Sequence, residues 1–322
     1  MSAPRVSVVT PFFDTAEYLA ECIESVLAQT LGDFEYILAD NRSTDGSREI
    51  AEAYAAQDPR VRFVAFDEHL PQLANYNRAL RLMHPDARYC KVAQADDVLM
   101  PRCLEEMVAL AETDEAIGLV GAYTLLQDSV FLDGLDFREQ VLDGRVVGRR
   151  YFEGGPYILG TPTTCLYRSE VVRAHPEFYP VSARTGDAHA ALRTLADHRF
   201  GFVHQVLTVT RRNAGSISDS WSGMGVDPLT RRVLLELYGT RFLEPDALDR
   251  TRSRLEHRHY RVLGEGVLMR RPKTFWDLHR RELAVAGLGV GRAKLAFWTV
   301  VMAVRMLLNL EWFFRPTWPW NR

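Results

Sequence analysis

The sequence predicts an α/β fold, a doubly wound and mostly parallel β-sheet followed by a helical C-terminal extension. Strand and helix patterns alternate at short intervals over the first 126 residues, which is typical of βαβ units with parallel strands. Beyond residue 225 every apolar pattern has helical spacing. We therefore expect two domains, residues 1–222 and residues 223–322.

The strands are predicted from short apolar runs rich in β-branched residues. They cover residues 5–10, 34–39, 61–66, 89–94, 117–126, 163–168 and 200–210. A Gly-rich stretch from 127 to 162 interrupts the alternation, and within it residues 145–152 are a candidate short strand.

The helices are predicted from apolar residues three and four positions apart. They cover residues 18–29, 47–57, 72–83, 102–112, 169–174, 188–199, 228–239 and 246–263, with a terminal apolar stretch beyond them. Asp14 and Glu17 have the spacing of a capping box ahead of the first helix.

Charge is distributed unevenly along the chain. Residues 1–240 carry 23 Lys and Arg against 34 Asp and Glu, whereas residues 241–322 carry 16 against 8. The acidic body gives no reason to expect a nucleic-acid partner, and the basic C-terminal part suits contact with an anionic surface.

Cysteine usage and the N-terminus bear on the compartment. Cys22, Cys90, Cys103 and Cys165 include no C-x-x-C pair, which argues against a zinc site and a disulfide framework. The first residues lack the apolar core of a signal peptide. We expect a cytoplasmic protein.

Polar clusters follow three of the predicted strands: TPFFD at 10–14, ADNRSTDGS at 39–47 and QADD at 94–97. Each has a simpler explanation, because such residues also form turns and helix caps, as Asp96 and Asp97 could do for the helix after Pro101. Ligands bind at the carboxyl ends of the strands of parallel sheets. Three clusters on that edge predict a nucleotide site.

These motifs resemble the nucleotide-sugar-dependent glycosyltransferases of family 2, which have the GT-A fold. The matching segments are VSVVTPFFDTAEYLAECIESVLAQTLGDFEYILADNRSTDGS, LANYNRAL, YCKVAQADDVLMPRCLE and GTPTTCLYRSEVV with a later Asp. The resemblance covers roughly residues 4–218. It implies a nucleoside-diphosphate sugar donor and a hydroxyl acceptor on a glycan or lipid-linked glycan, as in synthesis of cell-envelope polysaccharides.

The resemblance implies a nucleobase pocket at the ends of the first two strands. The family's base-contacting acid corresponds to Asp40, and Pro11 and Phe13 would form part of the pocket. Asn41 lies in the same donor-binding segment, and Asp45 would shape the pocket or act as a cap. The expected nucleotide is UDP, with dTDP and GDP left open.

The family's D-x-D-like element corresponds to Asp96 and Asp97. The resemblance assigns Asp96 to the ribose hydroxyls and Asp97 to a divalent metal, Mn²⁺ or Mg²⁺, that bridges the diphosphate. Such hard cations prefer oxygen ligands and use few protein carboxylates together with substrate phosphates. The chain departs from the family at Gln94, where an acid is common, so the metal depends on Asp97.

A second departure lies after the last strand. The family often shows Arg-x-His there, whereas this chain has Arg211-Arg212-Asn213. Arg211 or Arg212 would then take over the phosphate charge. Asn77 matches a family Asn near the donor, although it could equally be a surface helix residue.

The family places its catalytic base at the start of a helix on the acceptor side, which corresponds to Asp187. A helix N-cap would also explain an Asp there. His189 is a weaker candidate for the base. The resemblance implies an inverting, hexosyltransferase-like enzyme. The chain lacks the Gln/Arg-x-x-Arg-Trp signature of processive members, so we expect it to transfer one sugar. A non-catalytic nucleotide-sugar-binding scaffold and a nucleotidyltransferase are the alternatives.

The C-terminal stretch 292–314 combines apolar and basic residues. Its apolar part, residues 295–314, is long enough to span a bilayer. Arg305 at its centre would cost about 2.5–3.5 kcal/mol there. We expect instead a helix lying on an anionic membrane surface at the inner face of the cell membrane, with packing on protein and spanning as alternatives.

Overall fold

The computed structural model describes residues 3–182, 185–211 and 224–308. The chain divides into two compact units, Met1–Ala214 and Gly215–Arg322. Residues 212–223, which contain the expected boundary at 222, lie outside the described part, so that boundary stays a prediction.

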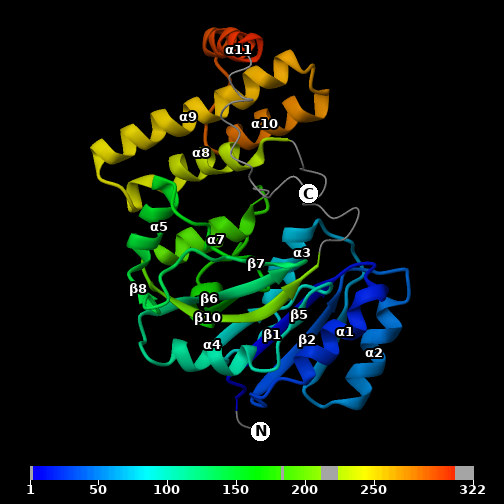
Figure 1. The fold of residues 1–322 in the computed structure, drawn as a ribbon. Helices are drawn as coiled ribbons and strands as arrows, with labels where there is room; N and C mark the ends of the chain where they lie inside the picture. The colour runs from blue at the N-terminus through cyan, green and yellow to red at the C-terminus, as the bar shows by residue number, and fades with distance from the viewer. Residues whose placement is uncertain (1–2, 183–184, 212–223, 309–322) are drawn as a thin grey trace. The chain divides into compact units, whose positions relative to one another are not determined.

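The first unit is built on one β-sheet (Figure 1). Its strands are β1 (Val6–Phe12), β2 (Phe34–Asp40), β3 (Val61–Ala65), β4 (Tyr89–Val92), β5 (Val98–Leu99), β6 (Ile117–Leu126), β7 (Ser129–Phe131), β8 (Val141–Leu142), β9 (Cys165–Arg168) and β10 (Arg199–Thr210). Its helices are α1 (Ala16–Leu27), α2 (Ser47–Gln57), α3 (Gln72–Leu80), α4 (Cys103–Ala111), α5 (Gly144–Glu153), α6 (Ser169–Arg173) and α7 (Gly186–Leu195).

The strand order is β3-β2-β1-β4-β9-β6-β10-β5, with β7 beside β6 and β8 beside β10. The strands β3, β2, β1 and β4 are mutually parallel, and β6 is parallel to β10. Strand β9 runs antiparallel to both of its neighbours. The predicted α/β fold with a mostly parallel sheet is confirmed.

Helices cover both faces of the sheet. Buried residues of α1, α2 and α4 form one core cluster with alternate residues of the strands, such as Val6 and Val8 of β1. Helices α3, α6 and α7 contact β1, β9 and β6 but contribute no residue to that cluster, which puts them on the other face. The carboxyl ends of the parallel strands are thereby left for loops.

Two local predictions are wrong. Residues 145–152, expected as a strand, belong to α5: Asp143 accepts a hydrogen bond from the Arg145 amide at 2.7 Å, and Gly154 ends the helix at φ +100°. The capping box is absent, because Asp14 has φ +48° and accepts instead from the Thr44 amide at 2.7 Å.

The second unit is helical in its described part, as predicted. It contains α8 (Val226–Tyr238), the short 3₁₀ helix η2 (Gly239–Arg241), α9 (Pro245–Leu268), α10 (Lys273–Val285) and α11 (Arg292–Leu307). Helices α9 and α11 approach closely at Gly264, where an added Cβ would lie 2.8 Å from the Trp298 backbone. Within the described ranges, no helix combines the length and apolarity needed to cross a membrane.

Candidate functional site

The loops after β1 and β2 are joined by hydrogen bonds at the carboxyl edge of the sheet. The Asn41 amide donates to the Phe12 carbonyl at 2.9 Å, and the Thr15 amide donates to Ser47 Oγ at 2.8 Å. The side chain of Asp45 accepts from the Ala16 amide at 2.9 Å and from Ser47 Oγ at 2.6 Å. The two predicted clusters therefore form one structure.

Asp45 precedes the N-cap position of α2, so it is not the cap itself, but its Oδ1 accepts from the Ser47 amide at 3.1 Å. Burial acts to raise its pKa, but the hydrogen bonds from Ser47 and from the Ala16 amide outweigh burial and lower it. The α2 N-cap position itself is Gly46, in the left-handed region at φ +98°. Asp45 thus stays ionised and fixes the start of α2.

Asp40 ends β2 and is fully buried. One of its oxygens accepts from the Ser43 amide at 2.8 Å and the other from Arg48 Nε at 3.0 Å. A carboxylate oxygen can accept a second hydrogen bond, so Oδ1 keeps acceptor capacity, whereas Oδ2 also lies 3.0 Å from Arg48 Nη2. The partner Arg48 was not predicted, because a single Arg on a helix looks like an ordinary surface residue.

The neighbours of Asp40 differ in exposure. Pro11 is buried in β1 beside Ala39, while Phe13 is 42% exposed and its ring lies 4.3 Å from that of His69. Asn41 is buried, and its side chain exchanges two hydrogen bonds with the Leu70 backbone. An exposed aromatic ring near a buried acid suits a planar, hydrogen-bonding ligand.

Asp96 and Asp97 follow β4 and precede β5. Helix α4 begins later, with Arg102 at its N-cap position, so the alternative that these acids cap that helix is wrong. Asp97 is 2% exposed, and its Oδ1 accepts from the Arg211 amide at 3.3 Å. Its Oδ2 is buried and has no hydrogen-bond partner.

The electrostatics of this pair reflect burial and like charge. Burial, followed by the neighbouring charge of Asp96, raises the pKa of Asp97 to about 7. Two adjacent carboxylates with one buried, unpartnered oxygen form an unfavourable arrangement unless a proton or a cation joins them. Asp97 Oδ2 is therefore one of the buried polar atoms of the described residues that lack a hydrogen-bond partner.

Arg211 lies at the end of β10, next to this pair. Its Nη1 donates to the Asp96 carbonyl at 3.4 Å, and its Nη2 lies 2.5 Å from Glu21 Oε2 on α1. The guanidinium also lies over the Tyr18 ring, 5.4 Å from its centre. The predicted Arg211 is thus brought to the acids, whereas Arg212 lies outside the described residues.

A hydrogen-bond network around Thr163, close in sequence to the two acids through Gln94, was not predicted from the sequence. Thr163 Oγ1 accepts from the Gln94 amide at 3.1 Å, and Lys91, fully buried in β4, donates to the Thr163 carbonyl. Gln94 Oε1 lies 3.4 Å from the same hydroxyl. The contact of Lys91 could not be predicted from the sequence, because its partner Thr163 is 72 residues away along the chain.

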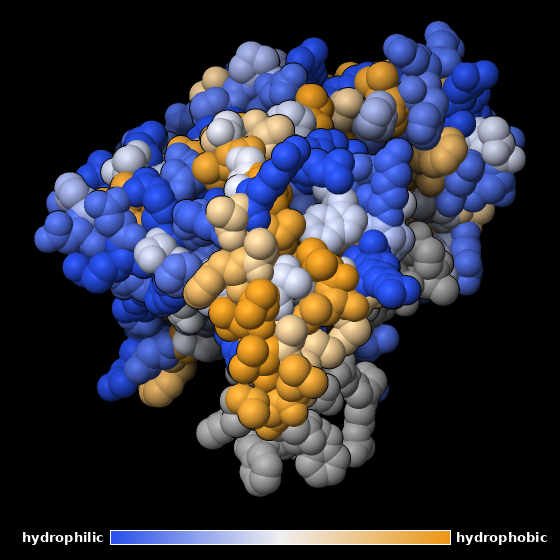
Figure 2. Space-filling view, turned by 90° about the horizontal axis from the view of Figure 1, so that it is seen from above, coloured by the Kyte–Doolittle hydropathy of each residue, from blue (hydrophilic) through white to orange (hydrophobic). Residues whose placement is uncertain are grey.

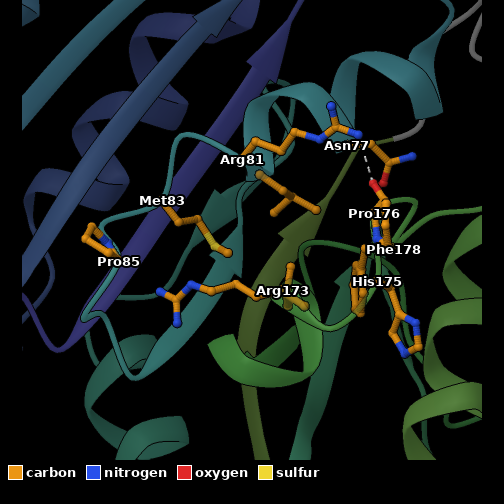
Figure 3. A pocket seen from close by; sticks show the side chains of 10 residues that line it. Asn77, Arg81, Met83, Pro85, Arg173, His175, Pro176 and Phe178 are labelled. Atoms are coloured by element: carbon orange, nitrogen blue, oxygen red, sulfur yellow. Dashed lines mark hydrogen bonds between the residues drawn. The ribbon is translucent and has the colours of Figure 1, made fainter.

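Asn77 is buried rather than on the surface, so that alternative is wrong. It donates to the Tyr179 carbonyl at 2.7 Å and accepts from the Tyr179 amide at 2.9 Å. It also lines a cavity of about 380 Å³, where Arg81 donates to the Pro176 carbonyl at 3.2 Å (Figure 3). None of the candidate acids lines that cavity.

Asp187 is the second residue of α7, and Thr185 holds the N-cap position, so the N-cap alternative is wrong. Burial raises the pKa of Asp187 to about 6, although the Ala188 amide donates to it at 2.8 Å. Burial also lowers the pKa of the neighbouring His189 to about 4. Asp187 is therefore the better proton acceptor near neutral pH.

Tyr76 and Tyr179 are in ring contact, and each of them is influenced by the charge of a candidate acid. Burial, followed by the charge of Asp96, raises the pKa of Tyr76, and the Tyr76 ring lies 6.0 Å from that of Tyr179. Burial, with a contribution from the Asp187 charge, raises the pKa of Tyr179. The start of α7 also touches α3, because a Cβ on Gly186 would lie 2.9 Å from Leu73.

The site offers few protein ligands to a divalent metal. In the part of the chain that the structure describes, no group of three or more His, Cys, Asp or Glu could hold an ion. The buried, unpartnered Oδ2 of Asp97 is nevertheless a hard oxygen ligand. The site fits a cation that takes most of its ligands from a bound phosphate compound.

The sequence profile described as "Glycosyl transferase family 2" matches residues 7–175. "Glycosyltransferase GlyG" of Streptococcus pneumoniae is 28% identical over 245 residues, which cover 71% of this chain and 79% of that protein. The profile covers the ends of β1, β2 and β4 and stops before α7 and β10.

Two solved structures have a similar fold. S. aureus TarS 1–349 in complex with UDP-GlcNAc aligns with a TM-score of 0.64 at 15% identity, covering 88% of this chain and 81% of that one. Mannosyltransferase PcManGT from Pyrobaculum calidifontis, in complex with GDP-Man and Mn²⁺, aligns at 0.56 and 17%, covering 95% and 81%. At these identities the likeness concerns the fold.

Proposed function

The chain belongs to glycosyl transferase family 2, and from this we propose that it moves one sugar, with inversion, from a nucleoside-diphosphate sugar to a hydroxyl of a glycan or lipid-linked acceptor. The family match and the curated glycosyltransferase relatives make the protein a glycosyltransferase enzyme. The scaffold and nucleotidyltransferase alternatives are therefore set aside.

One observation carries the proposal: the buried, unpartnered Oδ2 of Asp97 beside Asp96 at the carboxyl edge of the sheet. A divalent cation, Mn²⁺ or Mg²⁺, would be held there by Asp97 together with the donor diphosphate. When bound, it supplies charge neutralisation for the departing nucleoside diphosphate. The PcManGT complex with Mn²⁺ supports such a cation in this fold.

The donor is proposed to lie across the ends of β1, β2 and β4. Asp40 would accept from the nucleobase, with Pro11 and Phe13 beside the base and Asn41 and Asp45 holding the loop.

The remaining donor contacts lie nearer the diphosphate. Asp96 would accept from the ribose hydroxyls, Arg211 would face the phosphate oxygens, and Asn77 would hold the Tyr179 segment next to the donor. A UDP donor is preferred because TarS has been solved with UDP-GlcNAc. The GDP-Man complex of PcManGT keeps GDP as the alternative.

Asp187 is proposed as the general base. Its carboxylate takes the proton from the acceptor hydroxyl while that oxygen forms a bond to the anomeric carbon. The bond from this carbon to the diphosphate breaks on the opposite side, so the configuration inverts. The raised pKa of Asp187, about 6, suits a base that must accept a proton near neutral pH.

We also propose that the enzyme works in the cytoplasm, peripherally at the inner face of the cell membrane. All four cysteines are buried and free, which fits a reducing compartment. The residues of α11 carry the proposed membrane contact, because apolar side chains including Phe297 and Leu307 are exposed on it.

The transfer is tested by incubating the protein with a panel of α-linked nucleotide sugars, Mn²⁺ and oligosaccharide or lipid-linked acceptors. We expect one sugar to be added per acceptor, with a β linkage by NMR. An α-linked product would contradict inversion, and a polymer would contradict single transfer. Failure of every donor to give nucleoside diphosphate would contradict the proposed reaction.

A further inference from the structure

A row of arginines runs along one side of α9 in the second unit. Arg250, Arg254, Arg258 and Arg261 recur at intervals of three or four residues and share one helix face. Together with His257 of α9 and Trp298 of α11 they line an open groove of about 520 Å³. The first three arginines are exposed, and Arg261 is half-buried.

The floor of the groove is held in place. The Trp298 ring lies 5.5 Å from that of His257, and Lys294 donates to Glu256 at 2.7 Å. The close approach at Gly264 brings the two helix backbones together beside these contacts. The arginine row and α11 therefore form one surface.

Three acids near the groove each pair with a basic residue that does not line it. Glu256 also binds Arg232, which is on α8, at 3.0 Å, and Asp249 pairs with Arg252 at 2.6 Å. Asp227 lies 3.7 Å from Arg258 but is also 2.9 Å from Arg231. Most of the second unit lies in the basic part of the chain, since residues 241–322 carry 16 Lys and Arg against 8 Asp and Glu.

The outer face of α11 is apolar. Phe297, Val300, Val304 and Leu307 lie on one side of the helix and are 63%, 62%, 47% and 84% exposed. Figure 2 shows apolar side chains gathered in a strip over this helix, with hydrophilic side chains beside them. Met302 is the buried residue on the opposite side. This helix thus points its apolar face away from the core of its unit.

We propose that the arginine groove of α9 binds the phosphate groups of anionic membrane lipids while the apolar face of α11 enters the acyl boundary. This rests on the proposed peripheral membrane contact and assigns its charged half to named residues. Phosphate fits arginine because the guanidinium donates two parallel hydrogen bonds. Exposed apolar side chains beside a basic row match the layering of headgroups over acyl chains.

A second copy of the chain is a poorer occupant. In a two-fold interface the same surface meets itself, so the arginine row would face or adjoin its own copy. That contact would place like charges together while burying the apolar face. An anionic lipid surface supplies both the opposite charge and the apolar layer.

The test is co-sedimentation of the full chain with vesicles of phosphatidylcholine alone or mixed with phosphatidylglycerol. We expect the wild type to bind only the mixed vesicles. The double variant Arg250→Gln/Arg254→Gln should bind roughly 30-fold more weakly, since each Arg near an anionic surface contributes about 1 kcal/mol. The matched control is Arg270→Gln/Arg271→Gln, which removes the same charge from exposed positions outside the groove.

The outcomes separate the two proposals. If the wild type binds neither kind of vesicle, both the membrane contact and the groove assignment are wrong. Sugar transfer is tested independently by its own assay. If both double variants lose the same affinity, the groove assignment fails and the membrane contact remains. Tight binding of inorganic phosphate that depends on Arg250 and Arg254 without vesicle binding would overturn the lipid assignment. The lipid assignment would also be overturned if the wild type formed a dimer that Val300→Ser/Val304→Ser disrupts and did not bind vesicles.

Discussion

Asp97 is the residue on which the proposed chemistry depends most. Its folded pKa of about 7 lies above the ordinary value of 3.8, mainly because of burial and then because of Asp96. A raised carboxyl pKa contributes stability that is complete below the unfolded value and is lost as the pH rises through the folded one. Without a cation, the ionised Asp97 therefore weakens the fold above neutral pH.

This gives a prediction for Asp97→Asn, which resembles the neutral acid. In metal-free buffer at pH 8 the variant should be more stable than the wild type by roughly 1–3 kcal/mol, since an unpartnered buried charge is removed. The gain should shrink as the pH falls toward 4. Urea unfolding across this range measures it, and a less stable variant at pH 8 would show that Asp97 already has a partner.

Asp187 is predicted to control the acidic limb of the pH–rate profile. Its carboxylate must be ionised to accept a proton, so kcat should fall below about pH 6. Asp187→Asn should lower kcat by roughly 10²–10⁴-fold while donor binding is retained. The exposed Asp197, just beyond the same helix, offers the matched control Asp197→Asn, which should keep the wild-type profile. Full activity in Asp187→Asn would require another base.

Strands and helices could be predicted from the sequence better than the contacts between side chains, and longer elements better than short ones. The strands were readable because their apolar runs are continuous, and β6 matches its predicted bounds of 117 and 126. The short strands β5, β7 and β8 were missed, because two or three residues carry no periodic signal. Helix α5 was mistaken for a strand. Its buried residues Val147, Tyr151 and Phe152 are spaced as on one face of a helix, but this spacing is visible only over the whole segment.

The candidate site was predictable only where it follows strand ends. Asp40, Asp96 and Asp97 could be located because polar residues after buried strands are visible in sequence. Lys91 and Thr163 were not, because their contacts join residues far apart along the chain. Asn77 lay between these cases: its position was predicted, but its hydrogen bonds to Tyr179 depend on the packing of α3.

Helices α8, α9 and α10 are joined by a buried polar chain. Arg232 Nη1 donates to His259 Nδ1 at 3.0 Å, His259 Nε2 lies 2.8 Å from His279 Nδ1, and His279 Nε2 lies 3.0 Å from the Met224 carbonyl. Arg232 can only donate and the carbonyl can only accept. Both imidazoles must therefore be neutral and carry their proton on Nε2.

Burial lowers the pKa of both histidines, with their mutual contact and Arg232 adding to the effect at His259. Since the unfolded chain protonates near the ordinary value of 6.5 while the folded one stays neutral, this part of the stability is lost as the pH falls below 6.5. Nitrogen-15 NMR at pH 6 should show two Nε2–H tautomers that do not titrate. Ordinary titration near pH 6.5, assigned with His259→Gln, would mean that the chain is not formed.

At the scale of the molecule, different tasks are proposed for the acidic body and for the basic C-terminal part. The first unit carries the acids proposed to hold a sugar donor, and the second carries the arginine groove and the apolar face of α11. The confirmed fold and family fix the reaction class. The sugar and acceptor depend on loops, whose sequence carries no general code for specificity.

The most direct measurement of the central claim is UDP binding by calorimetry, with and without Mn²⁺, in the wild type and in Asp97→Asn. If Asp97 shares a cation with the diphosphate, Mn²⁺ should tighten UDP binding at least tenfold in the wild type, or by about 1.4 kcal/mol, and leave the variant unchanged. If UDP does not bind, GDP takes its place in the same measurement. An equal tightening in both proteins, or no effect of Mn²⁺ on the wild type, would contradict the account.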